Sequence, residues 1–131
     1  MTETIAYLNP EGTCPAQGLY SHATEVPASG RTLYIAGQLA VGLDGSVVGK
    51  NDFAAQMRQV LDNLGAVLAA AGARFADVVR TTIYLASMDD FATVNAAYGE
   101  RFPSDPPARA TVQAARLPRD ARVEIDAIAI I

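Results

Sequence analysis

The sequence predicts a two-layer α+β domain in which two helices cover one face of a β-sheet. Two segments show the hydrophobic spacing of helices, and segments rich in β-branched and aromatic residues flank them in the order β-β-α-β-α-β-β. The chain has 131 residues, of which half are hydrophobic and 18% are charged. We therefore expect one domain over residues 1–131, with a core that needs no disulfide.

Two strands are expected first, at residues 20–26 and 31–41. The segment "RTLYIAGQLAV" is rich in β-branched and aromatic residues, and "YSHATEV" alternates between apolar and polar positions. The Ser-Gly pair at 29–30 would connect them as partner strands. The Asp-Gly pair at 44–45 supplies turn chemistry after the second strand.

An apolar stripe predicts the first helix. Its members recur at helical spacing and are Phe53, Met57, Val60, Leu61, Leu64, Val67, Leu68 and Ala71. Asn51 or Asp52 can cap the start of this helix. Gly72 lies where a glycine commonly ends one.

A strand at 77–86 and a second helix follow. The segment "DVVRTTIYLA" returns to strand composition. Ser87 together with Asp90 imitates a capping box, which predicts the start of the helix. The apolar stripe of this helix consists of Phe91, Val94, Tyr98 and Phe102, and "FPSDPP" then forms a rigid loop.

The last two strands are expected at 108–117 and 122–130, with "PRDA" between them. Alternation along the final strand puts Val123, Ile125, Ala127 and Ala129 on one face, but Ile128 and Ile130 on the other. Two helices can cover only one face of the sheet. The second apolar face is therefore expected to meet another subunit, although a few exposed isoleucines are also tolerated in monomers.

Charge and composition exclude several classes of function. The net charge of −4 and the pI near 4.8 argue against a surface for nucleic acid or for anionic membranes. Cys14 and His22 are the single cysteine and the single histidine, which is too few for a Cys/His zinc site or an internal disulfide. The first ten residues lack the features of a signal peptide, and no apolar run approaches the roughly 20 residues of a membrane span. A cytoplasmic protein without a metal is expected.

In family order, the fragments "GLYSHA", "YIAGQL", "QVLDNLGAVLAAAG", "DVVRTTIYLASMDDFATVNAAY", "PPARATVQAARLP" and "VEIDAIAI" cover the chain from about residue 20 to residue 130. Together they resemble the RidA/YjgF family of reactive-intermediate deaminases. The resemblance implies a chorismate-mutase-like fold and a homotrimer with ligand pockets between subunits. It also implies cofactor-free hydrolysis of 2-enamine and 2-imine acids, such as 2-aminoacrylate, to 2-oxo acids and ammonia.

The resemblance also assigns site residues. Arg109 is implied as the arginine that binds the substrate carboxylate, and Glu124 as the acidic residue near the reacting water. Tyr20 is implied as an aromatic pocket residue, and Gly37 as the glycine of the segment that many members have as "SGQ". Thr111 stands where many close members have cysteine, and its hydroxyl is expected to bond a substrate oxygen.

The chemistry of these residues can be weighed against plainer interpretations. Strand alternation puts Arg109, Thr111 and Gln113 on one face, which by itself is also typical of a solvated surface. A planar guanidinium, however, grips a carboxylate with two parallel hydrogen bonds, which orients the neighbouring imine carbon. Glu124 suits general acid–base work, whereas Asp126 is expected to be an ordinary exposed carboxylate.

A simple hairpin between the last two strands would put Glu124 opposite Ala115, with Arg109 ~20 Å away along the strand. A shared pocket is incompatible with that arrangement. The family resemblance implies another strand between these two, so that the site depends on tertiary and subunit geometry.

Other departures from the family bear on substrate choice. Ala36 replaces a common serine and Leu19 a common proline, while His22 stands where glutamine is usual. Two other functions stay open. A non-catalytic trimer would keep Arg109 for binding small carboxylates or would bind partner proteins. Ribonuclease activity, also associated with the family, is disfavoured by the acidic composition and the lack of a histidine pair.

Overall fold

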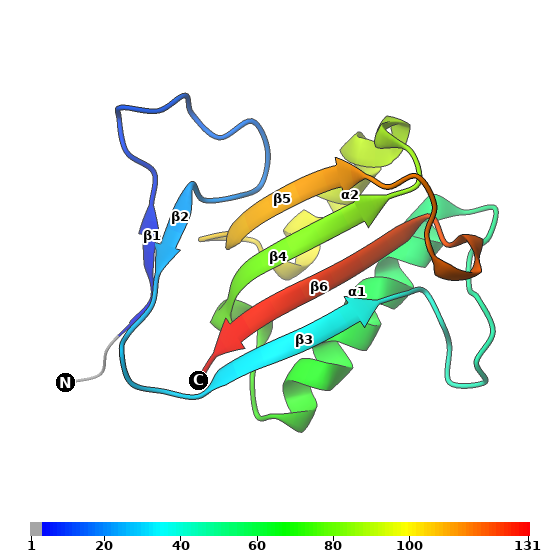
Figure 1. The fold of residues 1–131 in the computed structure, drawn as a ribbon, viewed down its shortest axis with the longest axis horizontal. Coiled ribbons are helices and arrows are strands. Elements are labelled where there is room, and N and C mark those ends of the chain that lie inside the picture. The colour runs from blue at the N-terminus through cyan, green and yellow to red at the C-terminus, as the bar shows by residue number, and fades with distance from the viewer. Residues whose placement is uncertain (1–3) are drawn as a thin grey trace.

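The computed structural model describes residues 4–131 and consists of a four-stranded sheet with two helices on one face, plus a separate two-stranded ribbon (Figure 1). The first three residues of the expected domain lie outside the described residues. The strands are β1 (Ala6–Leu8), β2 (Ala23–Glu25), β3 (Thr32–Gln38), β4 (Val78–Leu85), β5 (Ala108–Gln113) and β6 (Val123–Ile130). The helices are α1 (Phe53–Ala70) and α2 (Phe91–Arg101), with single 3-10 turns η1 (Phe75–Asp77), η2 (Met88–Asp90) and η3 (Pro118–Asp120).

The main sheet is mixed and has the strand order β3-β6-β4-β5. β6 pairs antiparallel with β3 and with β4, whereas β4 and β5 run parallel. The predicted two-layer arrangement, with both helices on one face of a mixed sheet, is confirmed. β4 lies between β5 and β6, so the last two strands do not form a hairpin.

The helix α1 packs its predicted stripe against the sheet. Met57, Val60 and Leu64 have no exposed surface. The side chain of Asp52 accepts a hydrogen bond from the backbone N–H of Ala55 and caps the helix start. At the other end Gly72 has φ +76°, the left-handed conformation in which a helix commonly terminates. Both predicted ends of this helix are therefore confirmed.

The helix α2 begins later than the capping box suggested. Ser87 caps the single turn η2, where its hydroxyl accepts from the N–H of Asp89, and the regular helix starts at Phe91. Val94 and Tyr98 of the predicted stripe are fully buried. Ser87 does act as a cap, as predicted, but it caps the 3-10 turn that leads into the helix and not the helix itself.

The predicted strand at 20–26 is wrong in extent and in partner. Only β2 forms there, and it pairs with β1, a strand that the sequence analysis did not predict. The partner of β3 is instead β6, from the other end of the chain. Residues before β2 dock on the start of β5, because the N–H and hydroxyl of Ser21 donate to the carbonyls of Pro107 and Pro106. The alternating pattern of this segment therefore reflects docking and not a hairpin.

The strand β5 ends at Gln113, four residues earlier than expected. Its partner β4 ends at Leu85, whose carbonyl accepts the N–H of Ala114. Beyond that point no strand continues the ladder, and the chain turns back so that Leu117 is buried. Leu117 is therefore apolar because its side chain is buried, not because it belongs to a strand.

The second face of the sheet is not covered by a helix (Figure 1). Burial alternates along β6, with full burial on the helix side and partial exposure at Glu124, Asp126, Ile128 and Ile130. Tyr34 of β3 is 78% exposed and Val112 of β5 is 44% exposed. We call this surface the open face.

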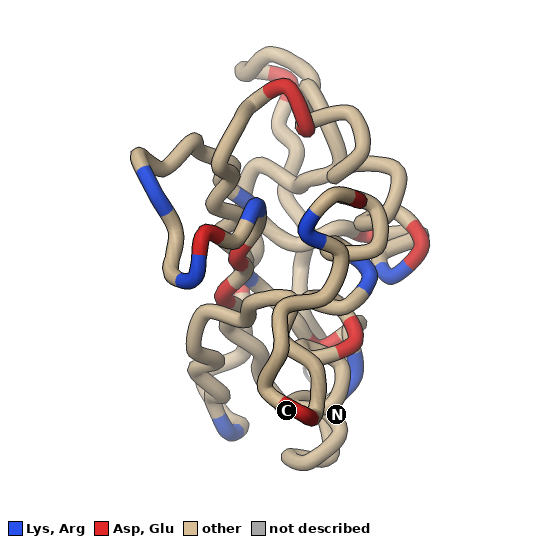
Figure 2. Tube along the Cα trace, turned by 90° about the vertical axis from the view of Figure 1, so that its right-hand side faces the viewer, with Lys and Arg blue, Asp and Glu red and all other residues tan. Residues whose placement is uncertain are grey.

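In the view of Figure 2, acidic and basic positions are interspersed along the chain trace. Neither of the two α-helices in residues 4–131 combines the length and apolarity that a membrane crossing requires.

Candidate functional site

Arg109 lies on β5 and points to the helix side of the sheet. Its Nε donates to the hydroxyl of Thr111 at 3.0 Å, its Nη1 to the carbonyl of Leu19 at 3.3 Å, and its Nη2 to the side-chain oxygen of Asn95 at 2.8 Å. A guanidinium has five N–H groups. Among residues 4–131 these three bonds leave one N–H on Nη1 and one on Nη2 without an acceptor, and the two terminal nitrogens of a guanidinium can form a fork toward a carboxylate.

Aromatic rings flank the same guanidinium. Its central carbon lies 4.9 Å from the ring centroid of Tyr98 and 5.6 Å from that of Phe91, so both contacts are of the cation–π type. Burial lowers the pKa of Arg109, and burial raises the pKa of Tyr98 to about 12. The Tyr98 hydroxyl also hydrogen-bonds the fully buried Thr81 at 2.8 Å.

Arg109 is partly buried without an anionic partner. Among residues 4–131 no carboxylate lies within ion-pair distance of its guanidinium, and all three of its hydrogen-bond acceptors are neutral. A cation that has lost part of its hydration and lacks a counter-ion gains from binding an anion. A guanidinium in such surroundings can bind a small carboxylate.

Tyr20 lies in the loop that passes over this region. Its hydroxyl accepts the backbone N–H of Gln17 at 3.1 Å, and its ring meets that of His22 edge to face. Both rings line a cavity of about 500 Å³ together with Cys14. His22 also hydrogen-bonds the carbonyl of Cys14 at 2.7 Å. The loop is therefore folded on itself beside the arginine, and the interaction with Tyr20 partly offsets the lowering of the Arg109 pKa that burial causes.

Glu124 lies on β6, on the open face of the sheet. It sits against Gly37 of β3, at the irregular register between Ile35 and Gln38. A Cβ atom at Gly37 would lie 2.5 Å from Oε2 of Glu124 and 2.8 Å from its carboxyl carbon. A larger residue at position 37 would force the Glu124 carboxylate to move from its present position. The structure therefore brings two of the expected site residues, Glu124 and Gly37, into contact.

Arg109 and Glu124 lie on opposite faces of one sheet. Arg109 is the register partner of Thr81, which faces the helices, whereas Glu124 is the partner of Tyr84. Tyr84 is on the open face, where its hydroxyl donates to Asp126 at 3.1 Å and its pKa is raised by that bond. The two site residues are also displaced by three positions along β4, about 10 Å. Within one chain they do not share a pocket.

The structure changes the expectation for Thr111. Its hydroxyl oxygen accepts the Nε–H of Arg109, so it orients the guanidinium in addition to any substrate contact. Ala36 and Gly37 are exposed on the open face. A cavity of about 490 Å³ there is lined by Tyr34, Ala36, Gly37 and Asp126 among others.

Sequence reasoning missed several residues around Arg109. Asn95 and the carbonyl of Leu19 hold its guanidinium, and the rings of Phe91 and Tyr98 flank it. Phe91 and Asn95 are four residues apart on α2, which places them on one helix face. That spacing was a usable signal, because an asparagine beside an apolar stripe stands out. Leu19 contributes its backbone carbonyl, which every residue type has, so the sequence could not indicate this role.

Comparisons with known proteins agree on one family. The sequence profile described as Endoribonuclease L-PSP matches residues 12–131. Protein DfrA of Myxococcus xanthus is 48% identical over 115 residues, which is 88% of this chain and 87% of that protein. The human 2-iminobutanoate/2-iminopropanoate deaminase is 44% identical over 115 residues, covering 88% and 82% of the two chains. The crystal structure of the Rid-family protein YyfB of Yersinia pestis, of unknown function, superposes with a TM-score of 0.89, at 39% identity and over 97% and 98% of the two chains.

Proposed function

Because the chain belongs to the Endoribonuclease L-PSP family, also called YjgF/RidA, we propose that it hydrolyses reactive 2-imine and 2-enamine acids to 2-oxo acids and ammonia. The observation that carries the proposal is Arg109, a partly buried guanidinium that donates to neutral acceptors and keeps one N–H on each terminal nitrogen without an acceptor among residues 4–131. Relatives at 43–45% identity that are named 2-iminobutanoate/2-iminopropanoate deaminase add support.

The reaction needs one water molecule and no redox partner. An enamine such as 2-aminoacrylate first tautomerises to the 2-imine, as its terminal carbon gains a proton from solvent and its nitrogen loses one. Water then adds to the imine carbon, the C–N bond breaks, and the products are the 2-oxo acid and ammonia. Arg109 would hold the carboxylate next to this carbon, and Glu124 would take the proton from water and deliver it to the leaving nitrogen. These steps use only water, proton transfer and the two side chains, so we propose that no metal or organic cofactor is required.

The proposed assembly is a homotrimer in which each pocket lies between two subunits. Arg109 from one subunit would meet Glu124 from the next, which accounts for their positions on opposite faces of one sheet. The exposed apolar residues of the open face, such as Tyr34 and Val112, would supply the interface. A cytoplasmic setting stays a prediction from the sequence.

A coupled assay tests the activity. A serine dehydratase generates 2-aminoacrylate, and the appearance of the 2-oxo acid is timed with and without this protein. We expect faster release when it is present, and unchanged release after EDTA treatment. If the protein does not change the release rate, the deaminase proposal is wrong, and a carboxylate-binding role without catalysis becomes the better explanation.

Mixed trimers test the position of the pocket. Subunits with Arg109→Ala and subunits with Glu124→Gln are each expected to be nearly inactive alone. Random co-assembly puts both kinds in about three quarters of the trimers, and each such ring has one pocket with both native residues. Tandem affinity purification after co-expression keeps only these mixed rings, in which one pocket of the three has both native residues, so we expect about one third of the parental activity.

The control is the mass of each preparation, expected near three times 13.8 kDa by light scattering. Activity in the mixture no greater than in the separate variants would contradict a pocket shared between subunits. A stable monomer at micromolar concentration would contradict the assembly altogether.

Gly37 provides a steric test of Glu124. Gly37→Ala puts a methyl group where the Glu124 carboxylate now lies, so the carboxylate must move by about 1 Å or more. A misplacement of that size is expected to lower kcat roughly 10- to 100-fold. Gly12→Ala is the matched control, because a Cβ there meets nothing within 4 Å. Parental kcat in the Gly37 variant would show that the position of Glu124 does not matter.

A further inference from the structure

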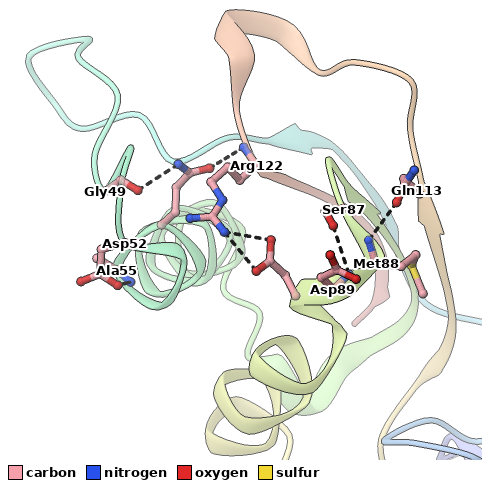
Figure 3. A network of polar contacts seen from close by, with 10 residues as sticks. Gly49, Asp52, Ala55, Ser87, Met88, Asp89, Gln113 and Arg122 are labelled. Carbon is pink, nitrogen blue, oxygen red and sulfur yellow. Dashed lines mark hydrogen bonds and ion pairs between the residues drawn. The ribbon is translucent and has the colours of Figure 1, made fainter.

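The start of β6 is held by a buried side chain from the helix layer. Gln56 of α1 is 1% exposed and stands among apolar neighbours on the core side of its helix. Its Nε2 donates to the carbonyl of Gly49 at 3.2 Å, and its Oε1 accepts the backbone N–H of Arg122 at 2.7 Å. Figure 3 labels Gly49 and Arg122, the two residues that this amide joins. One amide therefore joins the loop that follows β3 to the residue that precedes β6.

Arg122 is fixed by three further contacts. Its carbonyl accepts the N–H of Ala86 at 3.0 Å, which extends the ladder between β4 and β6 by one residue. Its Nη2 donates to both carboxylate oxygens of Asp90, at 3.0 and 3.1 Å, and its guanidinium lies 5.1 Å from the ring centroid of Phe53. The backbone and side chain of Arg122 are thus held by α1, by η2 and by β4.

The loop before Arg122 would not take this position unaided. Arg119 and Asp120 have φ values of 60° and 54°, and two consecutive non-glycine residues in the left-handed region are unfavourable unless surrounding contacts impose them. The turn η2 forms a second anchor at the same end of the sheet. The N–H of Met88 there donates to the side chain of Gln113 at the end of β5 (Figure 3).

We infer that Gln56 is a positioning residue for Glu124. Arg122 precedes Glu124 by two residues. The hydrogen bond from Gln56 to Arg122 therefore fixes the start of β6 and its position relative to the neighbouring strands. In its present position the Glu124 carboxylate packs directly against Gly37, with no room for a methyl group between them. A small shift of β6 therefore moves the carboxylate out of place. Gln56 acts from the opposite side of the sheet and needs no contact with substrate. The inference rests on the proposed function.

Gln56→Met tests this, because methionine keeps the length of the side chain and removes both hydrogen bonds. We expect kcat for imine hydrolysis to fall about tenfold, with KM within about twofold of the parent, because Arg109 is untouched. The same change in a Glu124→Gln background should lower the residual kcat less than about twofold, because the residue through which Gln56 acts is already lost.

Asn63→Leu is the matched control. Asn63 lies on the same helix, and its side-chain amide donates to the carbonyls of Leu39 and Val41 at 2.9 Å each. Its loss removes two bonds to the β3–α1 loop without affecting β6. We expect a lower melting temperature for both variants, but a lower kcat only for Gln56→Met. If Gln56→Met does not fold, Asp90→Asn weakens the hold on Arg122 more gently, and a two- to fivefold fall in kcat is expected.

Each outcome decides the question. The inference is wrong if the folded Gln56→Met protein keeps the parental kcat. It is also wrong if Gln56→Met lowers kcat by the same factor in the parent and in the Glu124→Gln background. Where Asp90→Asn carries the test, an unchanged kcat overturns the inference. An inactive parent protein would instead overturn the proposed function, and the inference with it.

Discussion

Glu124→Gln is expected to lower kcat for imine hydrolysis about 100-fold or more, with KM within about threefold of the parent value. A positioned carboxylate that moves protons contributes roughly 10²- to 10⁴-fold, and an amide of the same shape cannot accept the proton from water. The substrate carboxylate would be held by Arg109, which the substitution leaves intact, so binding is expected to survive. The coupled assay over a range of substrate supply separates kcat from KM.

Asp126→Asn is the control for this prediction. Asp126 is the next carboxylate along the same face of β6, and it accepts a hydrogen bond from the hydroxyl of Tyr84, which an asparagine side chain can also accept. We expect kcat within about twofold of the parent. An equal fall in kcat in the two variants would show that the negative charge of the open face matters, and not the position of Glu124. Parental kcat in Glu124→Gln would remove this residue from the mechanism.

The layers of the fold were predictable from local patterns. The apolar stripe of α1 and the glycine at its end are properties of adjacent turns, and both appear in the structure. The β-branched run of β4 is likewise local. The pairing of β3 with β6 joins opposite ends of the chain, and no local signal records it. The strand at 20–26 was wrong for the same reason, because alternation indicates that a segment is extended but not which strand it meets.

The site was predictable in its residue types but not in its geometry. The resemblance assigned roles to Arg109 and Glu124, while the strand order that places β4 between them decides their separation. Their opposite orientation follows from the register of β4, in which Thr81 and Tyr84 are an odd number of residues apart. Gly37 gains its meaning only from contact with Glu124. None of these separations and contacts can be predicted from the local sequence.

Arg109→Lys is expected to damage catalysis nearly as much as Arg109→Ala. A lysine keeps the charge but loses the planar fork and the bonds that orient it to Thr111 and Asn95. Losing such a charge-assisted contact costs on the order of 2–4 kcal/mol, a roughly 30- to 1,000-fold fall in kcat/KM. Because the substrate carboxylate is bound before and during the reaction, much of the loss should appear in KM.

The matched control is Arg101→Ala, which removes another arginine that lies near an aromatic ring, in this case Phe75, and that pairs with Asp62. Its kcat/KM is expected within about twofold of the parent, because it contacts neither Arg109 nor Glu124. Mass and melting temperature distinguish the remaining explanations for Arg109. An arginine that mainly supports the fold would, when replaced, lower the melting temperature and dissociate the trimer. A surface arginine would leave every measurement unchanged, and unchanged hydrolysis in Arg109→Ala would end its assignment as the substrate anchor.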